Sequence, residues 1–204
     1  MGINGNVAKL LGMSDISTSQ KYNATSKTGT FTNGTTGQSY IGSDLDTYLN
    51  TTWYNTLTST VKAAIVPESR TQYMYQYYDN PNTPNTPTYT YQYQYNWSDY
   101  ENANLTDSIL IGNRNIFALD LKDIFDYFGK VCITSNELME LWTNQTSAVI
   151  YKYWWLSSAS AVSPGNAWSV RGDGGYLFDD VVGSASAVRP AFNLDLSKIN
   201  FTKV

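Results

Sequence analysis

Three aspartates near the C-terminus are the best candidates in the sequence for a metal-binding or catalytic site. Asp179 and Asp180 are adjacent, and Asp173 precedes them in a glycine-rich stretch. Calcium is bound by about six or more oxygen ligands, usually from one carboxylate-rich loop, whereas Asp173 stands apart from the other two. A pair of carboxylates could also act as the acid and base of a glycosidase if they lay about 5–10 Å apart across a cleft. We therefore predict no metal ion and no cofactor, and keep a carboxylate-dependent, carbohydrate-active enzyme as an alternative.

Histidine, which many catalytic and metal sites require, is missing from the sequence. Without histidine, the sequence excludes Ser-His-Asp and Cys-His catalysis as well as histidine-ligated zinc or iron. Its single cysteine, Cys132, lies between Val131 and Ile133, which is typical of a buried strand residue. One cysteine cannot form an internal disulfide. These observations favour a protein that is not an enzyme.

The charge balance argues against a partner that is a nucleic acid or a membrane. The 204 residues include 13 basic and 17 acidic side chains, for a net charge of −4, whereas nucleic-acid binding needs a basic face. No stretch approaches the roughly 18 apolar residues of a membrane-spanning helix, and residues 1–13 lack the pattern of a signal peptide. If the protein works outside a cell, we expect a virion component or a fragment of a longer chain.

The C-terminal part of the chain predicts a compact antiparallel sheet. Turn signals at 163–166 and 172–175 separate three runs with β-strand character, because Gly and Asn accept the positive φ of tight turns. Trp154, Trp155 and Trp168 would place large apolar surfaces on this sheet. The three predicted strands are 153–156, 167–170 and 187–194.

The rest of the chain predicts a polar segment followed by a mixed domain. Residues 1–40 are rich in Gly, Asn, Thr and Ser, and we interpret them as a linker with short strands that could form an oligomer contact, for example in a homotrimer. Within them, 28–35 carries the Asn-Gly turn of a hairpin. The main domain spans 41–204, with helices expected to begin at Ser43 and Asp120. Further helices are expected at 59–65 and after Ser135, and further strands at 109–111, 115–119 and 130–133.

A tyrosine- and proline-rich insertion occupies about residues 69–100. Tyrosines alternate with other residues at 73–77 and at 89–95, which predicts two strands of a hairpin with a proline-rich tip. Tyrosine combines a large contact area with a hydroxyl group and a small loss of side-chain entropy, which suits adaptable recognition. The insertion is therefore either a packed hairpin or a secondary binding surface formed by Tyr89, Tyr91, Tyr93 and Tyr95.

Short motifs follow one another in a distinctive order over about residues 40–197. They are Ser-x-Leu-x-x-Tyr-Leu-Asn at 43–50, Lys-Ala-Ala-Ile at 62–65, Ile-Phe-Ala-Leu at 116–119, Tyr-Phe-Gly at 127–129, Trp-Trp-Leu-Ser-Ser at 154–158 and Val-Arg-Pro-Ala at 188–191. This order resembles a family of bacterial and phage domains with a WLRS-type and a VRPA-type strand. It is also similar to the wider C-type-lectin-like superfamily, which includes the variable tropism and adhesin proteins made by diversity-generating retroelements. Ser157 departs from the family pattern, which usually has Arg there, as do the tyrosine-rich insertion and residues 1–40.

The resemblance implies an α+β fold of the C-type-lectin-like type, with a small twisted antiparallel sheet, two or more helices and long irregular loops. In diversified relatives, exposed residues of the C-terminal sheet contact the ligand. Carried over by position, the ligand-binding residues would be Ser160, Ser163, Asn166, Trp168, Arg171, Asp173 and Tyr176. The buried counterparts would be Trp154, Trp155, Val188 and Phe192, and Arg189 would have a structural role.

These observations predict a non-enzymatic module that binds a cell-surface glycan or a protein receptor. Such a module would belong to a phage tail or fibre, or to a bacterial adhesin, and would act in host attachment on the virion or at the cell surface. The main alternative is a structural virion component whose tyrosine-rich insertion packs on a neighbouring subunit.

Overall fold

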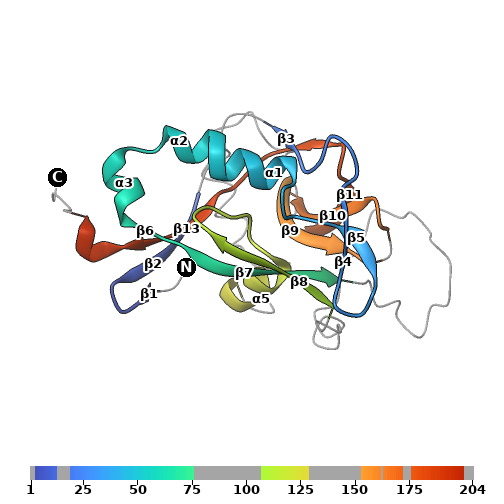
Figure 1. The fold of residues 1–204 in the computed structure, drawn as a ribbon, viewed down its shortest axis with the longest axis horizontal. Coiled ribbons are helices and arrows are strands. Elements are labelled where there is room, and N and C mark those ends of the chain that lie inside the picture. The colour runs from blue at the N-terminus through green and yellow to red at the C-terminus, as the bar shows by residue number, and fades with distance from the viewer. Residues whose placement is uncertain are drawn as a thin grey trace.

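The computed structural model describes residues 3–12, 19–75, 107–128, 153–161, 163–171 and 176–199 (Figure 1). It combines short helices with small β-sheets, which confirms the predicted α+β class. In chain order the elements are β1 (Ile3–Asn4), β2 (Val7–Leu11), β3 (Gln20–Lys21), β4 (Thr28–Thr30), β5 (Thr36–Gln38), α1 (Asp44–Thr47), the π-helix η1 (Tyr48–Trp53), α2 (Tyr54–Thr56), α3 (Ser59–Ala64), β6 (Ile65–Val66), β7 (Glu68–Tyr75), β8 (Ser108–Arg114), α5 (Leu121–Phe128), β9 (Trp154–Ser160), β10 (Asn166–Arg171), β11 (Tyr176–Val181), β12 (Ala185–Ser186), β13 (Ala191–Asp195) and the 3₁₀ helix η2 (Leu196–Lys198).

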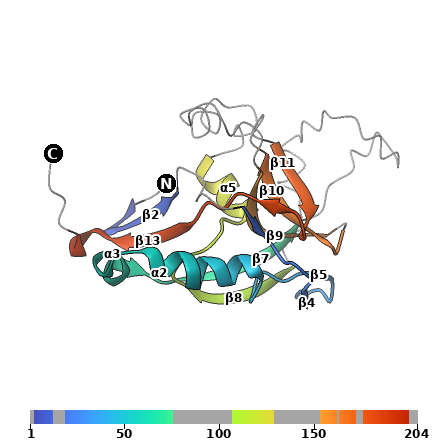
Figure 2. The same ribbon diagram turned by 90° about the horizontal axis from the view of Figure 1, so that it is seen from above.

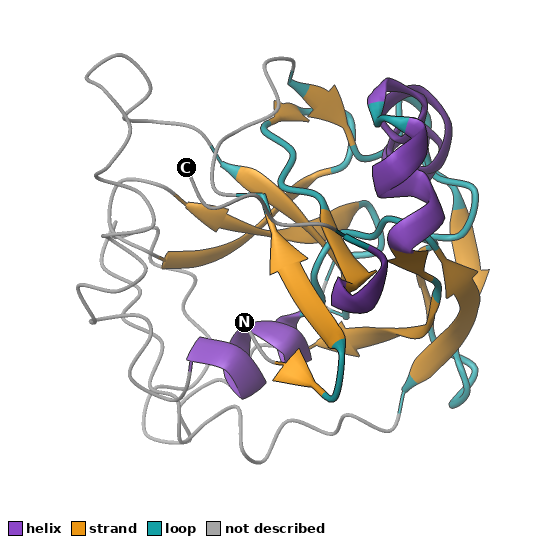
Figure 3. Ribbon diagram, turned by 90° about the vertical axis from the view of Figure 1, so that its left-hand side faces the viewer, coloured by secondary structure: helices purple, strands orange, loops and turns teal. Residues whose placement is uncertain are grey.

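Two sheets form the framework of the described chain (Figure 3). The first has the strand order β1-β2-β13-β6, and its pairs are antiparallel. The second has the order β11-β10-β9-β7-β8, in which only the β7–β9 pair is parallel. Figure 1 shows the four-stranded sheet on the left and strands β9, β10 and β11 on the right. Within the described segments, no helix is both long and apolar enough to cross a membrane.

The predicted C-terminal sheet is correct in its first two strands and wrong in its third. Strands β9 and β10 are antiparallel neighbours, and the turn between them closes with a hydrogen bond from the Asn166 backbone N–H to the Ser163 carbonyl. The third strand of the meander is β11. The predicted run 187–194 touches this sheet only at its start, where Ala187 forms a parallel bridge with Trp154 of β9. The β13 part of this run pairs instead with β2 and β6. β2 supplies an apolar strand partner for β13 from the opposite end of the chain.

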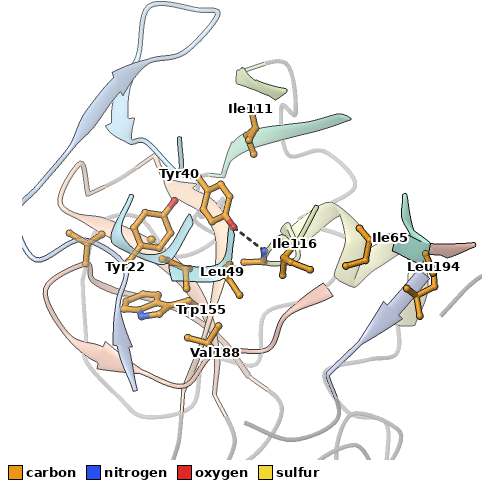
Figure 4. Packing of buried hydrophobic residues seen from close by; sticks show 14 residues of the cluster. Tyr22, Tyr40, Leu49, Ile65, Ile111, Ile116, Trp155, Val188 and Leu194 are labelled. Atoms are coloured by element: carbon orange, nitrogen blue, oxygen red, sulfur yellow. Dashed lines mark hydrogen bonds between the residues drawn. The ribbon is translucent and has the colours of Figure 1, made fainter. Parts of the chain in front are cut away.

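Residues before position 40 take part in the same core as the C-terminal half, so the linker interpretation does not describe 19–40. Tyr22 is fully buried, and its ring lies edge-on to Trp155 at a centroid distance of 5.7 Å. Its hydroxyl group donates to the Ser157 carbonyl oxygen at 2.9 Å. Tyr40 is also fully buried and accepts a hydrogen bond from the Ala118 backbone N–H (Figure 4). Two tyrosines of the polar segment therefore close one side of the hydrophobic core.

The predicted burial of the C-terminal aromatic residues is largely confirmed. Trp154, Trp155 and Val188 are buried, while Phe192 is partly buried and packs against Trp53 at a ring distance of 5.9 Å. Arg189 is buried as well, with its guanidinium group 5.6 Å from the ring of Trp154. This position fits a structural role for the arginine.

Local signals placed several elements correctly. Ser43 caps α1 by accepting from the Asp46 backbone N–H at 2.9 Å, and Asp120 caps α5 by accepting from the Lys122 backbone N–H at 2.9 Å. The β4–β5 hairpin turns at Gly34, whose φ of +83° favours glycine. The predicted strand 115–119 is reduced to one bridge at Phe117. The strand 130–133 with Cys132 and the helix after Ser135 lie outside the described residues.

Strand β7 includes the start of the first strand of the predicted tyrosine hairpin, and its described residues pair with β8 and β9. Tyr73 pairs with Ser108 of β8, and on the other side Tyr75 pairs with Ser160 of β9. Both sides of β7 are therefore occupied by described strands near its C-terminal end. The segment 76–106, with Tyr89, Tyr91, Tyr93 and Tyr95, lies outside the described residues.

Candidate functional site: the loop end of the five-stranded sheet

One end of the five-stranded sheet gathers residues from distant parts of the sequence, and we call it the loop end. The registers place five strand ends there: Ser108 of β8, Tyr75 of β7, Ser160 of β9, Asn166 of β10 and Val181 of β11. The connections 161–165 and 182–184 leave the sheet at this end. Both ends of the connection that carries the tyrosine-rich insertion, Tyr75 and Asp107, belong to it too.

The β4–β5 hairpin lies against the loop end (Figure 2). Its inner face is made by Gly29 and Gly37, and a Cβ atom added to Gly29 would come within 2.9 Å of the Ile109 Cδ1 atom. Glycine permits this close approach, since a Cβ atom there would require the end of the Ile109 side chain to shift. Phe31 is buried beside Met74 and Ala159 and holds the hairpin to the sheet.

Hydrogen bonds fix both ends of this hairpin. The buried carboxylate of Asp107 accepts from the Asn33 backbone N–H at 2.9 Å, and the Thr32 backbone N–H donates to the Ser108 carbonyl at 3.1 Å. At the other end, the Gln38 amide donates to the Pro164 carbonyl at 2.6 Å. The hairpin, the base of the insertion and the β9–β10 turn therefore form one connected surface.

Three of the predicted ligand-binding residues meet at the loop end. Ser160 is fully buried, and its hydroxyl oxygen accepts from the Ser163 backbone N–H at 3.3 Å, so it shapes the turn. Its predicted outward position is wrong, since it supports the surface from below. Asn166 is half-buried and donates from its amide to the Asp179 carboxylate at 3.3 Å. Ser163 and Asn166 are thus available at the surface, whereas Ser160 is not.

The comparison with family models covers most of the chain. Residues 10–196 match a model described as a domain of unknown function, DUF6273. The chain belongs to the DUF6273 family. No curated protein and no solved structure matches it. The match spans both sheets and the hairpin, so the DUF6273 domain includes the segment that the composition had suggested as a linker.

Three other predicted residues of the DUF6273 domain, Arg171, Tyr176 and Trp168, do not join this surface. Arg171 pairs with Tyr176 at the opposite end of the β10–β11 ladder, five residues or about 17 Å from Asn166. Asp173 lies outside the described residues, as do the side chains of Arg171 and Tyr176. Trp168 is fully buried, which corrects its expected outward position. A substitution of Trp168 would therefore perturb the core before it tested binding.

The sequence predicts the β4–β5 hairpin as part of a segment that could form an oligomer contact, and does not place it in the ligand-binding site. The signal that could have revealed its role is the Thr-Gly-Thr and Thr-Gly-Gln pattern, in which glycine alternates with hydroxyl and amide residues. Alternation along a strand puts the glycines on one face. That pattern indicates a hairpin pressed flat against another surface, with its threonines exposed, while the amide of Gln38 is buried against Pro164.

A second cluster of functional groups joins the two sheets away from the loop end. Glu68 accepts hydrogen bonds from Lys9 at 2.8 Å, from Arg70 at 2.7 Å and from Asn193 at 2.7 Å. Arg70 also makes a bidentate ion pair with Asp123 of α5, and its guanidinium lies 4.4 Å from the ring of Phe117. These residues come from β2, β7, β13 and α5, and the charges balance. We interpret the cluster, Lys9–Glu68–Arg70–Asp123–Asn193, as an ionic clamp between the sheets.

The ionic clamp predicts a specific loss of stability in acid. Burial by itself would raise the pKa of the Glu68 carboxyl group, but hydrogen bonds from Lys9, Arg70 and Asn193 outweigh it and hold this pKa below its ordinary value of 4.5. A carboxyl group with a lowered pKa stabilises the fold above its unfolded-state pKa, and this contribution is lost as the pH falls through the folded-state pKa. Below about pH 4.5, the free energy of unfolding should therefore fall more steeply for the wild type than for Glu68→Gln. Urea unfolding at a series of pH values measures this difference, and equal slopes would contradict it.

No group of His, Cys, Asp and Glu side chains suited to holding a metal ion occurs within the ranges that the structure describes. At the loop end, Asp179 contacts the Asn166 amide, and Asp180 accepts from the Val181 backbone N–H at 2.7 Å.

Proposed function

We propose that this DUF6273 domain is a non-enzymatic recognition module that binds a cell-surface glycan or protein receptor through the loop end. A C-type-lectin-like arrangement, in which a small sheet presents irregular loops, is part of this proposal. The setting we favour is a phage tail or fibre, or a bacterial adhesin, acting at the virion or cell surface.

The convergence of separate segments at the loop end carries the proposal. The β4–β5 hairpin, the 161–165 turn and the 182–184 turn lie at one end of a sheet whose interior is filled by Trp155 and Trp168. Cross-links such as Gln38 to Pro164 hold them in fixed relative positions. A surface that is ordered before binding loses less conformational entropy when a ligand binds, which favours affinity.

Binding should depend on the polar residues of the β9–β10 turn. Each hydrogen bond lost from a surface contact weakens binding by about 0.5–1.5 kcal/mol, so we expect Ser163→Ala/Asn166→Ala to weaken binding by about 10-fold. The measurement is binding of the purified protein to a glycan array and to whole bacterial cells.

The matched control is Thr52→Ala, which changes an exposed residue of η1 outside the loop end. This variant should bind like the wild type. A folded wild type that binds neither glycans nor cells would contradict the proposal, and so would a double variant with unchanged affinity.

A further inference from the structure

We propose that the outer face of the β4–β5 hairpin is a contact surface for neutral carbohydrate. We call this face, formed by Thr28, Thr30 and Thr36, the threonine face. The inference rests on the proposed function and goes beyond it, because it names both a surface outside the predicted ligand-binding residues and the chemical class of the ligand.

The geometry of the hairpin separates an inner and an outer face. Gly29 pairs with Gly37, and both face the sheet, where they approach Ile109 and Met74. Side chains alternate along a strand, so Thr28 and Thr30 point the other way. Thr30 pairs directly with Thr36, and all three threonines are exposed. The three exposed threonines therefore form a small array of hydroxyl groups. Figure 2 shows the β4–β5 hairpin that carries them at the edge of the fold.

This array is held rigid in two ways. Threonine is β-branched and has few side-chain rotamers, so its hydroxyl group has a restricted position on a strand. The backbone beneath it is fixed by the burial of Phe31 and by the hydrogen bond from Asn33 to Asp107. A ligand would therefore meet hydroxyl groups that are already in place, at a low cost in ordering.

The absence of charge on the hairpin favours a neutral ligand. From Thr28 to Gln38 the sequence contains no acidic or basic residue. The nearest charged side chain in sequence, Lys27, forms an ion pair with Asp44 at 3.4 Å and donates to the Gly42 carbonyl. A charged ligand would lose hydration at this face without gaining a counter-charge. Sugar hydroxyl groups donate and accept hydrogen bonds, as threonine hydroxyl groups do, and so match the threonine face.

The test removes the hydroxyl groups and leaves the shape of the side chains unchanged. Thr30→Val/Thr36→Val keeps the β-branched form and the strand preference, whereas Thr30→Ser/Thr36→Ser keeps the hydroxyl groups. The probes are neutral hexose and N-acetylhexosamine oligosaccharides, with sialylated and sulfated oligosaccharides for comparison. Affinity is measured by calorimetry on the full chain, and thermal unfolding confirms that each variant is folded.

We expect the wild type to bind neutral oligosaccharides, the valine variant to bind about 10-fold more weakly, and the serine variant to bind within about twofold of the wild type. If the wild type binds these probes and the valine variant binds equally well, the assignment to the threonine face is wrong while the proposed function stands. The inference also fails if binding is limited to charged glycans, or if attachment to cells survives removal of their glycans. If the wild type binds no glycan and no cell, the proposed function fails with it.

Discussion

Replacing Arg70 with alanine should lower the free energy of unfolding by about 3–5 kcal/mol. Arg70 is buried, and its guanidinium group pairs with both Asp123 and Glu68. Without it, two carboxylates would remain close together in a poorly solvated site with only Lys9 to balance them. Removing one partner of a buried ion pair leaves an uncompensated charge, and this is the main reason for the large effect. Equilibrium unfolding in urea measures the change.

Two further variants distinguish the ionic clamp from a general effect of charge removal. Lys122→Ala breaks an exposed pair with Asp126, and such pairs contribute about 0–1 kcal/mol. Arg70→Leu/Asp123→Leu removes both charges together and should be less destabilising than Arg70→Ala, because no unpaired charge remains. If Arg70→Ala lowered the free energy of unfolding as little as Lys122→Ala does, the ionic clamp would not hold the sheets together.

Replacing Trp155 with alanine should lower the free energy of unfolding by a comparable amount, about 3–5 kcal/mol. Trp155 is buried at the centre of the main core, packs against Tyr22, and donates from its indole N–H to the Gln20 carbonyl at 2.9 Å. The substitution would leave a cavity and an unpaired backbone carbonyl. For a chain of this size we expect the melting temperature to fall by about 6–20 °C, as measured by calorimetry.

The same experiment tests whether the N-terminal segment belongs to the core. Tyr22→Ala should also lower the melting temperature strongly, because Tyr22 packs on Trp155. The control Val181→Ala removes methyl groups from a largely exposed side chain and should have little effect. If Tyr22→Ala behaved like Val181→Ala, residues 19–40 would be dispensable for the fold.

Features that depend on neighbouring residues could be predicted from the sequence. The caps at Ser43 and Asp120 need only a side-chain oxygen close to the first helical N–H groups. The β4–β5 hairpin needs only Asn33 and Gly34 in its turn. The large apolar area of Trp154 and Trp155 was enough to predict burial.

Features that depend on contacts between residues far apart in the sequence could not be predicted. The position of 187–194 directly after the meander predicts a strand of that meander, but the β13 part of this run pairs with β2. Nothing local marks β2 as its partner, since β2 is short and follows a turn at Gly5. Strand β11 was missed because Asp179 and Asp180 reduce its strand character, although both lie at the edge of the sheet.

The candidate site was predicted only in part, because its residues come from segments that are far apart in the chain. Asn166 and Arg171 are the first and last residues of the six-residue strand β10. The turns predicted at 163–166 and 172–175 already imply that these two residues lie at opposite ends of the sheet, but a transfer of residues by position along the chain does not take that separation into account. The β4–β5 hairpin was missed as a site because its contacts, such as Gln38 with Pro164, join residues far apart in the chain.

The most direct test is to map the ligand contacts on isotopically labelled protein by NMR, using the oligosaccharide that binds best on the array. We predict that the backbone amide shifts on titration are concentrated at 28–36, 163–166 and 181–184, which together form the loop end. Shifts concentrated at Arg171 and Tyr176, or around the ionic clamp at Glu68, with none at the loop end, would contradict the account.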